Sequence, residues 1–353
     1  MDYTFSHKRI AFLDFSAIIS SFAVVTLHSS GTRYNFSYPS GFNILFILIP
    51  VIFSFGVPMF FMQSGVDILN YRQRYNTKVF WKKRTHKVIV PFLIWSIIAF
   101  IFNTFYPNQF SVGYGRGVSN LFLFIKSFFV KFFTGQLEGP YWFFYVIIGF
   151  YLIAPILSIL VYTLKKEQLQ YFLILAVIGN CLLPFLARVV NISSFDLPLT
   201  IVGGSLEYFL FGWYILNYPF SRKVSHRWYL LGILSLLAEI FGTFLLASKY
   251  GRVSDTFYNI GFILGFFFIT TLFLFLHNHE NFFFKFSKPL KYFAGLSFGI
   301  YLIHPFVLAF LNKYLIISHL TVHMIIFPIV LYLISGFVTW IVHKIPYFRN
   351  ILP

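Results

Sequence analysis

Charged residues are scarce in this sequence, and acidic ones are the scarcest. Asp, Glu, Lys and Arg make up 10% of the 353 residues, whereas 58% are hydrophobic and 52 are Phe. The mean hydropathy is +0.78. Since a soluble globular domain carries about 25% charged residues, this composition excludes that class. We therefore expect an integral membrane protein.

Cysteine is also nearly missing. The single cysteine, Cys181, lies in an apolar run, which excludes a disulfide framework and a thiolate metal site, so no metal is expected. No tandem repeat or low-complexity tract is present, and the longest loops (70–87 and 107–140) are too short to fold alone. We expect one transmembrane domain over 1–353, without a separate soluble domain. Asp14 interrupts the first apolar stretch and no small-x-small cleavage pattern follows, which indicates a retained helix rather than a signal peptide.

Long apolar runs are abundant. About 20 apolar residues cross the hydrocarbon core, and the absence of water there requires helices. The sequence thus predicts an all-α bundle of ten spans, at approximately 10–30, 42–69, 88–106, 141–164, 168–187, 199–218, 228–248, 256–276, 290–312 and 321–342. Lys126 and Lys131 divide the shorter run 120–133, which we interpret as an interfacial amphipathic helix.

Basic residues outnumber acidic ones by 27 to 10, giving a formal net charge of +17. In a membrane protein this excess is first a topology signal rather than a sign of nucleic-acid binding, and we expect no nucleic-acid partner. With a cytoplasmic N-terminus, 19 of the 27 Lys and Arg residues fall in inside segments. The alternation predicts ten spans with both termini in the cytoplasm.

Ionisable residues inside spans are costly and usually face a cavity or a partner. Asp14 and Asp67 lie near the inner interface, where they could instead be helix caps or salt-bridge partners. Glu239 could simply bond a neighbouring helix. His304 precedes Pro305, so its ring could satisfy backbone groups that the proline frees. The full set of candidates is Asp14, His28, Asp67, Glu207, Glu239 and His304.

Six local strings occur in an order that resembles the membrane acyltransferase-3 family. They are RIAFLDFSAIISSFAVVTLH (9–28), VPMFFMQSGVDIL (57–69), FWKKRTHKVIVPFLIWS (80–96), YWFFYVIIGFYLIAPIL (141–157), LEYFLFGWYI (206–215) and LSFGIYLIHPFVL (296–308). The resemblance covers nearly the whole chain. It implies an integral membrane acyltransferase, of a kind that often O-acetylates surface polysaccharides.

The resemblance implies a catalytic role for His28, which matches the first-span histidine of the family. The family usually has an arginine eleven residues earlier, where this sequence has Ala17. The missing charge would help hold the acyl donor or orient the site. Either Lys8, Arg9 or cations of the second loop compensate, or the protein diverges in donor or activity.

The second span and its following loop match the family's donor side. Ser64 and Gly65 belong to its Ser-Gly element; Gly permits close backbone approach and Ser can donate a hydrogen bond. Basic residues of the loop could bind the phosphates of coenzyme A, Arg84 and Lys87 first, although several also serve positive-inside anchoring. The candidate donor-binding residues are Ser64, Gly65, Arg72, Lys83, Arg84 and Lys87.

The resemblance implies O-acyl transfer, with acetyl the expected acyl group, from acyl-CoA to a hydroxyl of a cell-surface or lipid-linked glycan. Acetyl-CoA would be the donor substrate, and no permanently bound cofactor is expected. His28 would act as general base or transient acyl carrier. Glu207, also expected in the outer half of its span, would orient or charge-balance the imidazole. Partners would be acyl-CoA, the glycan acceptor and membrane lipid. The high Phe content suggests an AT-rich genome, hence a multi-pass protein of a bacterial plasma membrane.

Two other function classes fit parts of this pattern. Ten helices with buried carboxylates would suit a transporter or flippase for a lipid-linked glycan, but neither a repeated half nor a pair of matching interrupted helices is present. A structural subunit without chemistry would explain the missing arginine. Consumption of acetyl-CoA with glycan distinguishes these classes, because transport leaves the thioester intact.

Overall fold

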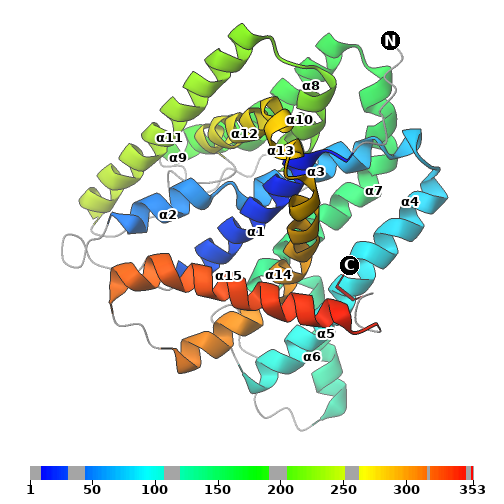
Figure 1. Ribbon diagram of the computed structural model, residues 1–353, viewed down its shortest axis with the longest axis vertical. Helices are drawn as coiled ribbons and strands as arrows, with labels where there is room; N and C mark the ends of the chain where they lie inside the picture. Colours follow the sequence, from blue (N-terminus) through cyan, green and yellow to red (C-terminus); the bar gives the residue numbers. More distant parts are fainter. Residues whose placement is uncertain are drawn as a thin grey trace.

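The chain folds into a bundle of helices (Figure 1). The computed structural model describes residues 9–30, 44–106, 120–190, 205–250, 262–315, 319–346 and 351–352. In these ranges every regular element is helical. The prediction of an all-α fold is therefore confirmed.

The α-helices have the following bounds: α1 Ala11–Ser30, α2 Leu45–Phe53, α3 Gly56–Leu69, α4 Thr77–Arg84, α5 Val90–Phe105, α6 Leu121–Phe133, α7 Trp142–Thr163, α8 Lys166–Val177, α9 Leu183–Val189, α10 Leu206–Asn217, α11 Arg222–Tyr250, α12 Ile263–Asn278, α13 Glu280–Phe284, α14 Ser287–Tyr314 and α15 Leu320–Lys344. Two π-helical turns, η3 Thr85–Ile89 and η5 Ile178–Leu182, join α4 to α5 and α8 to α9.

In the described ranges, eight helical stretches are long and apolar enough to cross a membrane. Two further expected spans, 199–218 and 256–276, correspond to the shorter helices α10 and α12, and both ranges begin outside the described residues. The helix count is thus compatible with ten spans. The run 120–133 forms the 13-residue α6, shorter than a span. Cytoplasmic termini and a single domain stay predictions.

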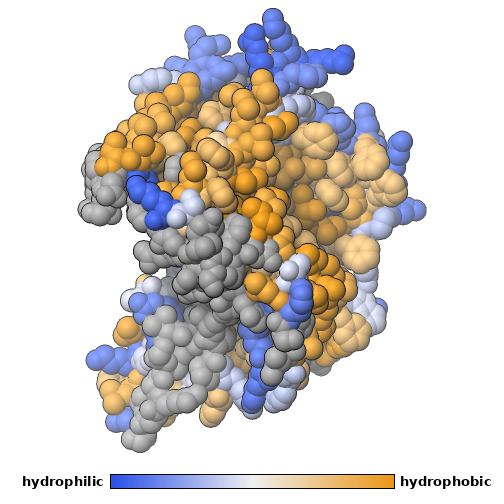
Figure 2. All heavy atoms as spheres, turned by 90° about the vertical axis from the view of Figure 1, so that its left-hand side faces the viewer, coloured by the Kyte–Doolittle hydropathy of each residue, from blue (hydrophilic) through white to orange (hydrophobic). Residues whose placement is uncertain are grey.

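The surface follows the distribution expected of a membrane protein. On the face drawn in Figure 2, hydrophilic side chains gather along the upper edge, and hydrophobic side chains cover the broad zone beneath them. Large apolar residues such as Leu152, Ile156 and Phe241 are more than 60% exposed. Such exposure is favourable where the surrounding solvent is lipid.

Helix α1 lies at the centre of the bundle, against α3, α14 and α15. Small residues make this close packing possible, as in other membrane bundles. Ser16, Ser20 and Ala23 on α1 are fully buried. On the neighbouring helices, an added Cβ at Gly56 would press on α1, and one at Gly299 would overlap Thr339 of α15.

Helices α3 and α10 cross with their backbones in contact. A Cβ on Gly65 would overlap the carbonyl of Phe209, and one on Gly212 would overlap the backbone of Met62. At the crossing point, each helix thus has a glycine in contact with the backbone of the other helix. In the described part of the chain, the backbone that comes close to Gly65 is that of α10, which gives this glycine a packing role.

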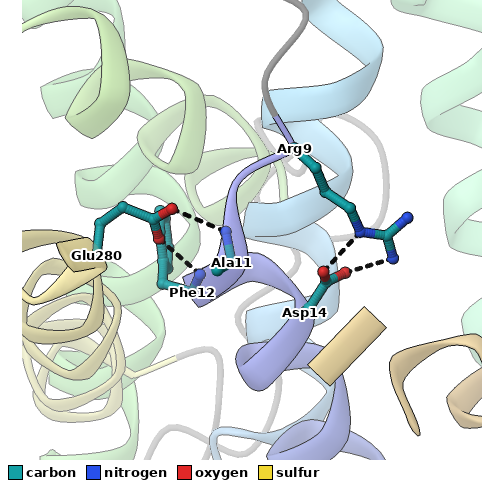
Figure 3. Close-up of polar contacts among 5 residues, drawn as sticks. All are labelled: Arg9, Ala11, Phe12, Asp14 and Glu280. Carbon is teal, nitrogen blue, oxygen red and sulfur yellow. Dashed lines mark hydrogen bonds and ion pairs between the residues drawn. The ribbon is translucent and has the colours of Figure 1, made fainter. Parts of the chain in front are cut away.

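The start of α1 is held by two acidic residues (Figure 3). Glu280 of α13 accepts hydrogen bonds from the backbone N–H groups of Ala11 (2.8 Å) and Phe12 (2.7 Å), which have no partner within their own helix. Arg9 donates to both carboxylate oxygens of Asp14, at 2.6 and 2.7 Å, and this hydrogen bonding raises the pKa of Arg9. The interpretation of Asp14 as a salt-bridge partner is confirmed.

Candidate active site

Two histidines from distant parts of the chain meet in the bundle. Nδ1 of His28, near the end of α1, lies 2.8 Å from Nε2 of His304 in the middle of α14. The ring planes are within 6° of parallel and the centroids are 5.0 Å apart. The 2.8 Å between the two nitrogens takes up more than half of the 5.0 Å between the ring centroids. The two rings therefore meet edge to edge through a hydrogen bond and do not stack face to face.

The other nitrogen of His304 fixes the direction of this hydrogen bond. Nδ1 of His304 lies 2.8 Å from the carbonyl oxygen of Tyr301 and 3.2 Å from that of Ile300. Carbonyl oxygens only accept, so Nδ1 carries the proton. Pro305 lacks the N–H that would bond the Tyr301 carbonyl in a regular helix. The expectation that His304 satisfies a backbone group freed by Pro305 is confirmed.

The proton positions of the pair follow from this contact. With Nδ1 protonated, a neutral His304 offers Nε2 as acceptor. Nδ1 of His28 must then donate to it, which leaves Nε2 of His28 as the basic nitrogen. An imidazole held in this tautomer can act as a general base or as a nucleophile. If His28 takes up a proton, Nε2 of His304 is in place to stabilise the imidazolium.

A cavity of about 220 Å³ lies between α1, α3, α7, α14 and the turn η3. Its polar wall comes from Gln63, Ser64, Asp67, Tyr151 and Ser297, and its apolar wall includes Phe60, Phe143 and Phe298. The side chain of Asp67 is exposed to this space, and no ion pair joins it to another described residue. A polar-lined cavity inside a membrane bundle suits a substrate with polar groups.

The cavity and the histidine pair are connected through Tyr301. Its ring lines the cavity and contacts the His304 ring edge-on, with centroids 5.8 Å apart. The Tyr301 hydroxyl donates to the carbonyl of Pro140, and Tyr141 donates to the carbonyl of Leu302 at 3.2 Å. These contacts anchor this part of α14 to the start of α7, so the wall between cavity and histidines is held on both sides.

Ala17 lines the same cavity. The expected arginine of the family would therefore place its charge there. Of the proposed substitutes, Lys8 lies outside the described residues, and Arg9 forms the ion pair with Asp14. Arg84 is better placed, because its guanidinium carbon lies 5.7 Å from the ring centroid of Tyr151, which lines the cavity.

The guanidinium of Arg84 uses only part of its hydrogen-bonding capacity among the described residues. Its Nη2 donates to the Tyr75 hydroxyl over a long 3.5 Å. Its Nε is buried and has no hydrogen-bond partner among the described residues. The residue ends α4 directly before the π-helical turn η3, and such turns often occur at functional sites. A ligand oxygen could accept from this nitrogen.

The other predicted donor-binding residues spread over the same end of the bundle. Arg72 donates to the Ser158 hydroxyl (2.9 Å) and to the Pro155 carbonyl (3.2 Å), so it braces α7. The ammonium of Lys83 lies 4.0 Å from the Tyr75 ring centroid. Lys87 is exposed and precedes Val88, which lines the cavity.

Glu207 lies elsewhere. It is fully buried on α10, where its Oε2 accepts from Asn180 of η5 at 2.8 Å. No hydrogen bond joins its carboxylate to either histidine of the pair. The structure brings His28 together with His304 instead, a pairing that sequence reasoning missed. Glu239 is also buried, and its Oε2 has no partner among the described residues.

Comparison with known proteins agrees with this architecture. The model of the acyltransferase-3 family, described as an acyltransferase domain, matches residues 10–344. Neither the curated proteins nor the solved structures give a match. The family match includes both histidines and every helix around the cavity. The protein therefore belongs to the acyltransferase-3 family and is a multi-pass membrane acyltransferase.

Proposed function

We propose that the protein transfers an acetyl group from acetyl-CoA to a hydroxyl of a cell-surface or lipid-linked glycan in a bacterial plasma membrane. The observation that supports this most is the His28–His304 pair, whose hydrogen bonding presents Nε2 of His28 as a base. Acyl transfer from a thioester needs a group that exchanges protons near neutral pH, and histidine is the side chain suited to it.

In the direct route, Nε2 of His28 takes the proton of the acceptor hydroxyl while the hydroxyl oxygen attacks the thioester carbonyl. The tetrahedral intermediate then breaks its carbon–sulfur bond, and the thiolate leaves with the proton from His28. In the acyl-carrier route, Nε2 itself attacks the thioester carbonyl, and the carbon–sulfur bond breaks to release the coenzyme A thiolate. The acceptor oxygen then attacks the acetyl-imidazole, the carbon–nitrogen bond breaks, and the hydroxyl proton ends on the thiolate. In both routes His304 accepts from Nδ1–H and stabilises the positive ring.

The donor would enter at the end of the bundle that carries Arg84 and Lys87. Coenzyme A is anionic at its adenosine end, and charge-assisted hydrogen bonds from guanidinium groups suit phosphates. Its neutral arm would occupy the cavity beside Ser64 and Tyr301 and extend the thioester toward the histidines. The carboxylate of Asp67 at the cavity wall would repel an anionic group of the ligand, which favours an uncharged acyl arm in the cavity.

Purified protein in lipid nanodiscs tests the proposal directly. With ¹⁴C-acetyl-CoA and a surface-glycan extract from the source cells, we expect label in the glycan and an equal amount of free coenzyme A thiol. Glycan extract that has been chemically de-O-acetylated serves as the acceptor-rich sample. If acetyl-CoA stays intact while glycan is bound or moved, a transport function replaces acyl transfer.

The donor site makes a separate prediction. The double variant Arg84→Ala with Lys87→Ala should raise the apparent KM for acetyl-CoA by about tenfold or more, because hydrogen bonds to charged groups contribute about 1.5–3 kcal/mol. The KM for the acceptor should change little. Lys82→Ala is the matched control, since this exposed lysine lies on the same helix α4. A donor KM equal to that of the control would return both residues to membrane anchoring.

A further inference from the structure

A second, mostly apolar groove lies on the opposite side of α14 from the substrate cavity. It has a volume of about 470 Å³ and runs between α1, α14 and α15. Ile18 and Ile300 form its floor, while Phe293, Leu333 and Phe337 form its open side. Acyl transfer as described above makes no use of this space.

The open side of the groove faces the lipid. Phe293, Leu333 and Phe337 are 54%, 64% and 58% exposed, and each lies within a helix long enough to span the membrane. A groove so lined, on helices long enough to span a membrane, suits hydrocarbon rather than water. A lipid chain is therefore the occupant that its lining favours.

One end of the groove is basic. Helices α14 and α15 pack against each other with Gly299 beside Thr339, and the groove is lined both by Tyr292 near the start of α14 and by Trp340 near the end of α15. Lys291 precedes the groove residue Tyr292 in the sequence, and the Lys344 ammonium lies 5.4 Å from the ring centroid of Trp340, another groove residue. Neither helix contains an acidic residue.

We propose that this groove is a binding site for an anionic phospholipid, with one acyl chain along Ile300 and Leu333 and the phosphate at Lys291 and Lys344. The apolar groove alone would accept the chain of any lipid. The two lysines add the charge complementarity that selects an anionic headgroup, each contributing about 1 kcal/mol near a membrane surface. The site needs no assumption about the acyl donor or acceptor.

The bound chain would stabilise the packing that positions the histidine pair. Ile300 on the groove floor supplies one of the carbonyls near Nδ1 of His304 (3.2 Å). Tyr332, also a groove residue, shares a hydrogen bond of 3.1 Å with Ser21 of α1. A chain in the groove thus contacts the three helices whose mutual packing brings His28 to His304.

Native mass spectrometry of the full-length protein, with dioleoyl phosphatidylglycerol or dioleoyl phosphatidylcholine added to the detergent, tests the site. We expect one retained phosphatidylglycerol. Gly336→Leu should reduce its retention at least about tenfold, because a Cβ at Gly336 fits 3.5 Å from Ile300 and the remaining atoms of the leucine would enter the groove. Gly295→Leu is the matched control: this glycine is exposed on α14 and a Cβ there meets nothing within 4 Å.

The charge at the groove end is tested without disturbing the packing. Lys291→Gln combined with Lys344→Gln should lower the preference for phosphatidylglycerol over phosphatidylcholine, by about fivefold per lysine. Equal retention of the two lipids by the native protein would overturn the proposal. So would unchanged retention in Gly336→Leu, or a polyprenyl phosphate retained from the cells in place of phospholipid.

Discussion

His28→Gln is expected to lower kcat for acetyl transfer by about a thousandfold, within the range by which general bases contribute to catalysis. Glutamine keeps a hydrogen-bond donor near His304 but has no basic nitrogen, so neither proton removal nor nucleophilic attack is possible. The KM for acetyl-CoA should stay close to that of the native enzyme. The measurement is steady-state transfer of labelled acetyl groups by protein in nanodiscs.

Ser29→Ala is the control for this change. Ser29 is the next residue on α1, and among the described residues its hydroxyl donates to the Thr26 carbonyl of the same helix, at 3.0 Å. Activity of the control should stay within about twofold of the native value, as for substitutions away from special features. Substantial transfer by well-folded His28→Gln protein would show that His28 packs or binds but does not react.

Mass spectrometry after brief mixing with acetyl-CoA alone separates the two chemical routes. An acetyl group on His28 before acceptor is added indicates the acyl-carrier route. Its absence, together with full activity once acceptor is present, indicates direct attack by the acceptor hydroxyl. Both results are compatible with the proposed role of His28, since the hydrogen bonds of the described pair present its Nε2 as the base.

The sequence predicts well whatever depends on short stretches of chain. Apolar length alone indicated the helices, since backbone hydrogen bonding in lipid leaves no other choice. The position of Asp14 near the inner interface was enough to suggest a salt-bridge partner, and the structure identifies this partner as Arg9. The effect of Pro305 was also local: a proline frees a carbonyl four residues earlier, and His304 is close enough to satisfy it.

Contacts between distant helices were beyond such reasoning. His28 and His304 are 276 residues apart in the sequence, and no local pattern shows which faces of two helices meet. Glu280 caps α1 from a short loop helix 269 residues away. Gly65 appeared suited to a ligand, whereas it admits the backbone of α10 at Phe209. In each case the partner is set by helix packing, which one helix cannot reveal.

The substitution at position 17 gains a physical meaning from the cavity. Ala17 leaves the α1 wall of the cavity without a charge, while the guanidinium of Arg84 lies beside Tyr151, a lining residue from α7. A donor held there would then be anchored from α4 rather than from α1. This arrangement accounts for the missing arginine without requiring loss of activity, and the donor KM of Arg84 variants tests it.

His304→Leu is expected to lower kcat by about a hundredfold, while His304→Gln should keep activity within about tenfold of the native enzyme. Leucine removes the acceptor for Nδ1–H of His28, so the ring loses its fixed tautomer and its support when charged. Glutamine carries an oxygen near the place of Nε2 and can still accept that proton. The KM for acetyl-CoA should change little in both variants.

These two glutamine substitutions together assign the roles within the pair. Glutamine in place of a reacting imidazole is inactive, whereas glutamine in place of a positioning imidazole retains function. Pro305→Ala is an independent test of the same contact. The restored backbone N–H at position 305 competes with His304 Nδ1 for the Tyr301 carbonyl, so His304 is held less firmly. We expect kcat to fall, but less than in His304→Leu. If His304→Gln is as inactive as His28→Gln, His304 takes part in proton transfer itself and is more than a support for His28.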